Sequence, residues 1–134
     1  AGIADPSDSS ILGEDNTTVG EDNMTAVFEW VMRVNVLRAP LGTKHAGRAM
    51  VAAGRGGSII ITASLASAVG AMGHPVYSRS KHAVVGLERN TAADLGKHGV
   101  RVNCVSPGIV PTPLTESHYQ ASEEELEALG EVIS

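Results

Sequence analysis

Two short apolar runs constrain the fold of this chain more than any other feature. They cover residues 58–64 and 100–105 and are rich in Ile and Val, which favour strands. The first run is too apolar to alternate with polar residues, a pattern typical of a strand covered on both faces of a sheet. We therefore expect both runs to form buried strands.

Apolar residues spaced three and four apart predict helices before and after the first strand. A stripe over residues 24–50 predicts one or two helices, with Pro40 as a possible kink. A second stripe predicts a helix over residues 76–98, and Gly99 follows as its stop. The order helix, strand, helix, strand is the signature of an α/β fold, whose parallel strands are covered on both faces.

The chain length of 134 residues allows one modest domain, so we assign residues 1–134 to a single domain. Residues 5–23 are rich in Asp, Ser, Asn and Gly, which predicts an irregular surface loop. Residues 115–129 are acidic and amphipathic, which favours a short helical segment there.

Composition excludes several classes of partner. The net charge of −5 makes the chain a poor generic binder of nucleic acid or of an anionic membrane, because phosphates are repelled on average. No apolar stretch approaches the about 18 residues that cross a bilayer, and no signal-like core follows the first residues. A small-molecule or protein partner is favoured, and we expect a cytoplasmic protein.

The single cysteine, Cys104, cannot form an internal disulfide, which favours a reducing compartment. It lies inside the second apolar run, where a buried thiol is expected. His74, His82 and His118 have no metal-ligand spacing with Cys104 or with one another. The sequence therefore predicts no metal site.

Tyr77 and Lys81 are four residues apart on one predicted helix and so lie on the same helix face. A phenol is a poor acid or base at neutral pH, and a neighbouring ammonium stabilises the phenolate and lowers the pKa of the phenol. Such a pair suits proton exchange with an alcohol or a ketone. A plain surface pair is the alternative reading.

Ser64 stands at the carboxyl end of the first predicted strand, before Tyr77. Ligands of open parallel sheets bind outside the carboxyl ends of the strands, where this hydroxyl could meet a side chain of the next helix. The alternative is a serine that binds its own loop.

In sum these residues resemble the short-chain dehydrogenase/reductase family. Five motifs over residues 1–115 carry the resemblance, and they occur in the family's order: Ala1-Gly2, Val34-Asn35-Val36, the strand Gly57 to Ser64, the helix segment Tyr77-Ser78-Arg79-Ser80-Lys81-His82-Ala83, and the turn Arg101 to Gly108 with Thr112. The wording of residues 41–46 and 80–87 is similar to the plant branch that includes secoisolariciresinol and xanthoxin dehydrogenases. The resemblance implies the later half of a Rossmann-like, doubly wound parallel sheet.

The resemblance also implies catalytic roles. Tyr77 would exchange a proton with the substrate oxygen, and Ser64 would hold that oxygen. Lys81 would act on Tyr77 and bind the nicotinamide ribose. Asn35 would hold a water through its backbone and so link Lys81 to solvent.

For the cofactor, the resemblance implies NAD, with NADP not excluded. Gly2, Tyr77 and Lys81 would lie at the cofactor. Pro107 and Gly108 would turn the backbone toward the nicotinamide. Val110 would meet its carboxamide through main-chain groups, and Thr112 would reach the carboxamide or the pyrophosphate.

Some family features have no counterpart here. The chain contains no Gly-rich phosphate loop between a strand and a helix, so we expect it to correspond to the middle and later half of a family member. Residues 114–134 would form the substrate-loop region. The implied function is oxidoreduction of a secondary alcohol and a ketone by a homo-oligomer. The alternative is a truncated, catalytically silent product that pairs with a full-length relative through its long helices.

Overall fold

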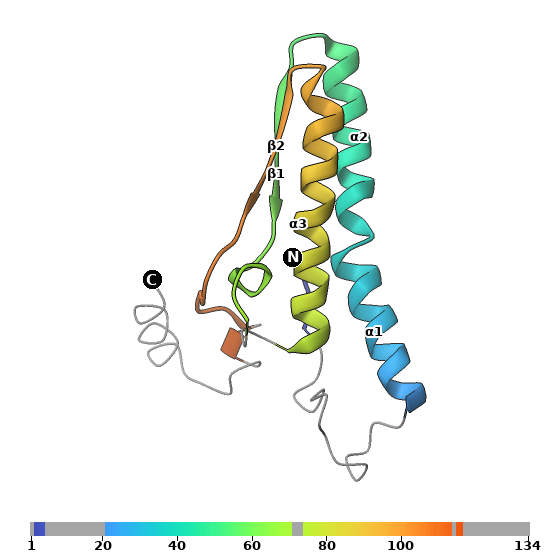
Figure 1. The fold of residues 1–134 in the computed structure, drawn as a ribbon, viewed down its shortest axis with the longest axis vertical. Coiled ribbons are helices and arrows are strands. Elements are labelled where there is room, and N and C mark those ends of the chain that lie inside the picture. Colours follow the sequence, from blue (N-terminus) through green and yellow to red (C-terminus); the bar gives the residue numbers. More distant parts are fainter. Residues whose placement is uncertain (1, 5–20, 71–73, 114, 117–134) are drawn as a thin grey trace.

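The computed structural model describes residues 2–4, 21–70, 74–113 and 115–116. The described elements are helices interspersed with two strands (Figure 1). In chain order they are α1 (Glu21–Asn35), α2 (Arg38–Ala53), β1 (Gly57–Thr62), the 3-10 helix η1 (Leu65–Ser67), α3 (Pro75–Gly96) and β2 (Val100–Val105). This order confirms the predicted α/β class.

β1 and β2 are parallel neighbours in a two-stranded sheet. Their register runs from Gly57 opposite Val100 to Thr62 opposite Val105. The pairing continues past the end of β1, because the amide of Ala63 donates to the carbonyl of Val105 at 2.8 Å. α3 forms the crossover between the two strands, as expected for parallel neighbours.

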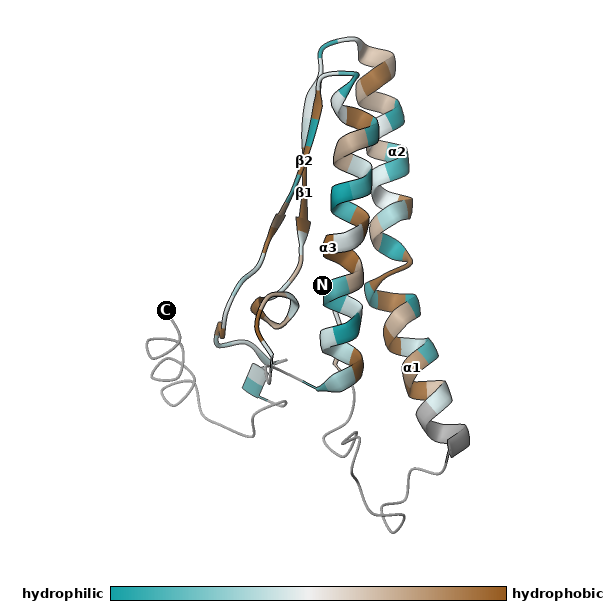
Figure 2. Ribbon diagram, in the orientation of Figure 1, coloured by the Kyte–Doolittle hydropathy of each residue, from teal (hydrophilic) through white to brown (hydrophobic). Residues whose placement is uncertain are grey.

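The expectation that both faces of the strands are covered is wrong for the described residues. α1, α2 and α3 lie on one side of the strand pair (Figure 1), and burial alternates along both strands. Val100 and Val102 are buried under the helices, whereas Ile60 is 67% exposed and Val105 50% exposed on the other face. The hydrophobic residues of the strands therefore extend beyond what these helices cover (Figure 2).

Cys104 also departs from its prediction. It lies in β2 with only intermediate exposure rather than full burial. Partial burial still raises the pKa of its thiol, and the nearby Glu88 carboxylate adds to this effect.

The long helical stripe is divided into α1 and α2, and the break lies before Pro40 rather than at it. In a continuous helix the proline ring would clash with the carbonyl four residues earlier, that of Val36. The chain instead interrupts the helix at Val36 and Leu37 and restarts at Arg38. Pro40 thus falls in the first turn of α2, where its missing N–H costs nothing.

Other predicted boundaries differ by a few residues. α1 already begins at Glu21, inside the predicted surface loop 5–23, and residues 5–20 of that loop lie outside the described residues. α3 runs from Pro75 to Gly96, close to the predicted 76–98. Most of the predicted segment 115–129 and of the substrate-loop region 114–134 also lies outside the described residues.

Two glycines form a tight backbone contact at the amino ends of the strands. Gly56 and Gly99 have φ values of +67° and +72°, which side-chain-bearing residues rarely adopt. A Cβ atom on Gly56 would lie 2.6 Å from the carbonyl oxygen of Gly99. The start of the sheet therefore depends on these glycines.

Within the described part of the chain, no helix combines the length and the apolar character that a membrane span requires.

Candidate active site

The candidate site lies where β1 ends and α3 begins. Lys81 is on the second turn of α3, is 6% exposed, and donates from Nζ to the carbonyl oxygen of Thr62 at 3.3 Å. Thr62 is the last residue of β1. The lysine therefore joins the helix to the carboxyl end of the strand.

Tyr77 and Lys81 lie together on α3, as their four-residue spacing predicts. Nζ of Lys81 is 5.5 Å from the centre of the Tyr77 ring, within the range of a cation–π contact. Burial lowers the pKa of Lys81 from its ordinary value, and the smaller influence of Cys104 opposes that change. The pair is therefore a partly buried phenol and amine rather than two solvated surface groups.

Ser64 follows β1 and caps η1 in an extended backbone conformation. Its Oγ accepts a hydrogen bond from the amide of Ala66 at 3.3 Å, so the local reading of this serine is correct. η1 also packs against α3, the helix that carries Tyr77. Both expectations for Ser64 are thus compatible, because accepting from Ala66 leaves its own hydrogen for another acceptor.

Asn35, the last residue of α1, is 7% exposed and makes three side-chain hydrogen bonds. Its Oδ1 accepts from the amide of Ile3 at 2.9 Å, and its Nδ2 donates to the carbonyl of Ile3 at 2.8 Å. Nδ2 also donates to Oγ of Ser80 at 3.0 Å. The predicted role of Asn35 concerned only its backbone, and the sequence did not indicate these side-chain bonds.

Gly2 lies next to this cluster. A Cβ atom at Gly2 would be 3.2 Å from Oδ1 of Asn35 and 3.4 Å from Nζ of Lys81. The structure therefore brings four predicted site residues, Gly2, Asn35, Tyr77 and Lys81, into one region.

The turn after β2 joins the same region through η1. The amide of Leu65 donates to the carbonyl of Pro107 at 2.9 Å, and Gly108 lies beside the Leu65 side chain. Pro107 and Gly108 are exposed, and Val110 is 50% exposed. These residues therefore lie in an exposed turn that is tied to η1 by the bond between Leu65 and Pro107.

Thr115 organises the rest of this turn, and the sequence motif did not single it out. Its hydroxyl donates to the carbonyl of Val110 at 2.6 Å and accepts from the amide of Thr112 at 2.8 Å. The hydroxyls of Thr112 and Thr115 are 3.0 Å apart. A serine or threonine three residues after the motif's threonine is the signal that could have indicated this contact.

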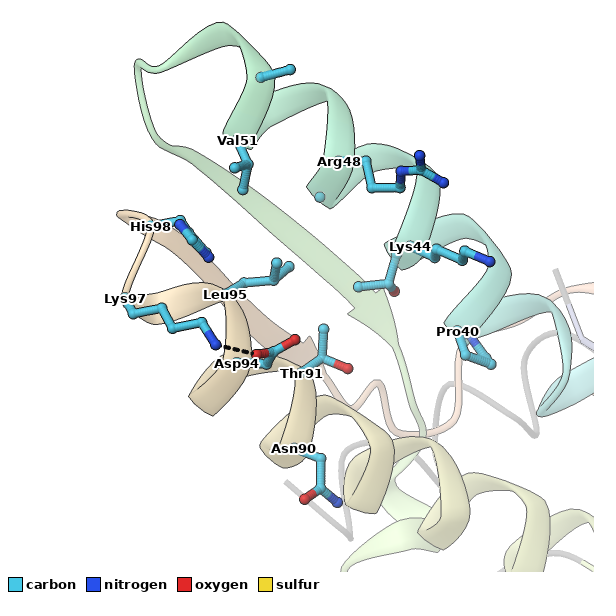
Figure 3. Close-up of a pocket in the computed structure, with 13 residues that line it drawn as sticks. Pro40, Lys44, Arg48, Val51, Asn90, Thr91, Asp94, Leu95, Lys97 and His98 are labelled. Atoms are coloured by element: carbon cyan, nitrogen blue, oxygen red, sulfur yellow. Dashed lines mark hydrogen bonds and ion pairs between the residues drawn. The ribbon is translucent and has the colours of Figure 1, made fainter.

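A separate groove lies between α2 and the carboxyl-terminal part of α3 (Figure 3). Lys44 and Arg48 reach it from α2, and an exposed ion pair joins Lys97 to Asp94 at 2.7 Å. None of the predicted site residues lines it. We do not assign it to the candidate site.

Comparisons with known proteins concern the family and the fold of this chain. The family model described as short chain dehydrogenase matches residues 7–123. Secoisolariciresinol dehydrogenase of Forsythia intermedia is 46% identical over 125 residues, which cover 93% of this chain and 42% of that protein.

Solved structures show the same fold. Levodione reductase superposes with a TM-score of 0.74 at 29% identity, covering 99% of this chain and 48% of that one. NAD+-bound xylitol dehydrogenase gives a TM-score of 0.61 at 33% identity, covering 66% of this chain and 34% of that one. The chain spans less than half the length of the relatives it matches, 37% of the first of them, and its described part is one portion of a Rossmann-like fold.

Proposed function

This chain belongs to the short-chain dehydrogenase family, and we propose that it carries the proton-transfer half of an active site that interconverts a secondary alcohol and a ketone. The observation that carries the proposal is Lys81, buried beside Tyr77 and bonded to the end of β1. A buried amine next to a phenol is an arrangement suited to acid–base chemistry.

In the oxidative direction, Tyr77 as phenolate accepts the proton of the alcohol. The ammonium form of Lys81 stabilises that phenolate by its charge. The hydroxyl of Ser64 donates to the substrate oxygen and so holds it at Tyr77. In the reductive direction the same groups act in reverse, and Tyr77 donates the proton to the ketone oxygen.

The residues present fit the nicotinamide end of a dinucleotide. The exposed turn at Pro107, Gly108 and Val110 would lie at the nicotinamide, and Gly2 leaves space beside Lys81. A bound nicotinamide would supply hydride transfer to and from the carbon that bears the substrate oxygen. Lys81 would hold the nicotinamide ribose, and Thr112 would lie near the carboxamide.

We propose NAD rather than NADP, supported by the NAD+-bound state of the related xylitol dehydrogenase. We also propose a small alcohol or ketone of plant secondary metabolism as substrate. The similarity to secoisolariciresinol dehydrogenase supports this class. A cytoplasmic location is part of the same proposal, and cell fractionation would test it.

A turnover assay tests the proposal. The protein is given panels of alcohols and ketones with NAD or with NADP, and the reaction is monitored by the absorbance of the nucleotide. Tyr77→Phe removes the proton acceptor and should lower kcat about 100- to 10,000-fold, with little change in nucleotide affinity by calorimetry. Asn90→Ala, an exposed change on the same helix, is the matched control. Full turnover by Tyr77→Phe would refute the assignment of Tyr77.

Self-association is a further part of the proposal. Trp30 and Leu37 are each 51% exposed, and Leu41 is 47% exposed, on and between α1 and α2. Large apolar side chains exposed in this way favour an interface with another copy. Light scattering should show an oligomer that Trp30→Glu with Leu41→Glu converts to a monomer, and an unchanged mass would contradict this surface.

Nothing in the comparisons favours the alternative of a silent partner.

A further inference from the structure

Ser80 is a fully buried hydroxyl for which the proposed function has no role. It is 0% exposed and stands directly before Lys81 on α3. Its Oγ donates to the carbonyl of Tyr77 at 2.7 Å and accepts from Nδ2 of Asn35 at 3.0 Å. The hydroxyl therefore contacts two predicted catalytic residues and is next to a third.

The direction of these bonds has a consequence for Asn35. A serine hydroxyl has one hydrogen, and here the carbonyl of Tyr77 accepts it. Toward Asn35 the hydroxyl can then only accept, so it selects the Nδ2 end of the amide. A flipped amide would present Oδ1 to an acceptor and would also mismatch both backbone groups of Ile3.

The orientation of Asn35 in turn places the Gly2–Ile3 segment. Asn35 binds both the amide and the carbonyl of Ile3, and Gly2 lies against Nζ of Lys81. Nζ also donates a hydrogen bond to the carbonyl of Thr62. The amine of Lys81 is thus held between β1 and a segment that Asn35 fixes.

We propose that Ser80 is a positioning residue that orients the Asn35 amide and thereby fixes the Gly2–Ile3 segment beside the amine of Lys81. Its effect on turnover rests on the proposed function, whereas its effect on Asn35 and Lys81 does not. Ser80 acts through Asn35 and touches no reacting group.

Nitrogen-15 NMR of the side chains tests the structural part directly. In Ser80→Ala, the Asn35 amide protons should exchange at least about tenfold faster, because a buried donor loses its acceptor. The titration of the Lys81 amine should move toward that of an ordinary lysine as water enters. Unchanged exchange and titration would overturn the proposal.

Thr91→Val is the matched control. The Thr91 hydroxyl donates to the carbonyl of Leu87 at 2.7 Å on the same helix, as Ser80 does to Tyr77. This bond stays within α3, so Thr91→Val should leave both NMR signals unchanged. A shift of equal size in Thr91→Val would mean that any lost hydroxyl loosens α3, which would also overturn the proposal.

Turnover tests the functional part through a double-mutant cycle. Ser80→Ala should lower kcat about tenfold and leave the KM values within about twofold, since no substrate contact is lost. In an Asn35→Ala background the Ser80 substitution should have almost no further effect. Equal effects in both backgrounds would show that Ser80 does not act through Asn35.

The outcomes separate this inference from the proposed function. If Ser80→Ala shows the predicted NMR changes but the wild-type protein shows no oxidoreduction, the proposed function is refuted and the positioning role of Ser80 is retained. Protein that turns over, requires Tyr77, and is unaffected by Ser80→Ala would refute only the positioning role. If circular dichroism shows that Ser80→Ala is unfolded, Ser80→Cys keeps the volume with a weaker hydrogen-bonding group and is read by the same criteria.

Discussion

The two ends of α3 are stabilised in different ways. At its amino-terminal end, Ser80 and Lys81 are buried, and Ser80 bonds to a residue 45 positions away in the chain. At its carboxyl-terminal end, the ion pair of Asp94 and Lys97 is local and exposed. Buried polar groups are costly unless they are bonded, so the fold holds Ser80 and Lys81 in place at the end where we propose the active site.

The comparison also shows why a surface groove alone does not identify an active site. The groove between α2 and α3 is lined by positive side chains such as Lys44 and Arg48 (Figure 3), and these residues are exposed. The candidate site has fewer charges, but its lysine is removed from water. An exposed charge contributes little interaction energy because water and salt screen it.

The largest expected difference between the two ends concerns their lysines. Lys81→Met should lower kcat about 100-fold or more, because the phenolate of Tyr77 loses its neighbouring cation. Lys97→Met should leave kcat within about twofold, since its ammonium is solvated. Steady-state kinetics of the two variants measures both effects, and equal losses would refute the functional distinction between the ends.

Asn35, which bonds to the amino-terminal part of α3, and Asn90, in the carboxyl-terminal part, should differ in how much they stabilise the protein. Asn35→Ala leaves the backbone groups of Ile3 and the hydroxyl of Ser80 without their partner, which should cost about 2–4 kcal/mol. The exposed Asn90 bonds only within its own helix, and Asn90→Ala should change the free energy of unfolding by less than about 0.5 kcal/mol. Urea denaturation measures both values, and a similar cost for the two would contradict the comparison.

Near the carboxyl-terminal end of α3, stability should depend on the backbone contact of Gly56 with Gly99 more than on side-chain bonds. Gly56→Ala introduces a Cβ atom 2.6 Å from the Gly99 carbonyl at a positive φ, which should cost about 1–3 kcal/mol. Gly42→Ala has open space around the new Cβ and replaces a helical glycine, so it should not destabilise the protein. Thermal unfolding of the two variants provides the test.

The pH dependence of stability should also report on Lys81. Its pKa is lowered from 10.5 by burial, so between the lowered value and 10.5 the unfolded chain binds more protons than the folded one. Stability contributed by Lys81 therefore rises as pH increases through that window. The raised pKa of Cys104, ordinarily 9.0, acts in the opposite direction above pH 9.0.

Comparing wild type with Lys81→Met isolates the lysine contribution, because both proteins retain Cys104. Denaturant midpoints measured from neutral to alkaline pH should rise more, or fall less, in the wild type than in Lys81→Met. Parallel curves would contradict the burial of Lys81.

The smallest effect is expected at the exposed ion pair. Lys97 lowers the pKa of Asp94 through a hydrogen bond and its charge, but both side chains are largely exposed. Asp94→Asn should leave the melting temperature unchanged within error at physiological salt. A clear drop in melting temperature that persists at high salt would show that the Asp94–Lys97 pair is more than a solvated surface ion pair.

Much of the fold was predictable from local pattern, because helix periodicity, strand composition and glycine stops act over a few residues. The contact of Tyr77 with Lys81 was predictable for the same reason, since one helix turn fixes it. The bonds among Ile3, Asn35 and Ser80 were not, because they join segments whose proximity only the folded chain determines. The exposed outer face of the sheet was also missed, because the apolar strand residues indicate coverage and not which segment provides it.

The bonds of Asn35 also set an order of events during protein synthesis. Ile3 is made 32 residues before Asn35, and Ser80 45 residues after it. At about 5–20 residues per second, the ribosome reaches Ser80 roughly 2–9 s after Asn35. During that interval Asn35 can bind Ile3 but not Ser80. The hydrogen bond to Ser80, which completes this cluster, therefore forms last.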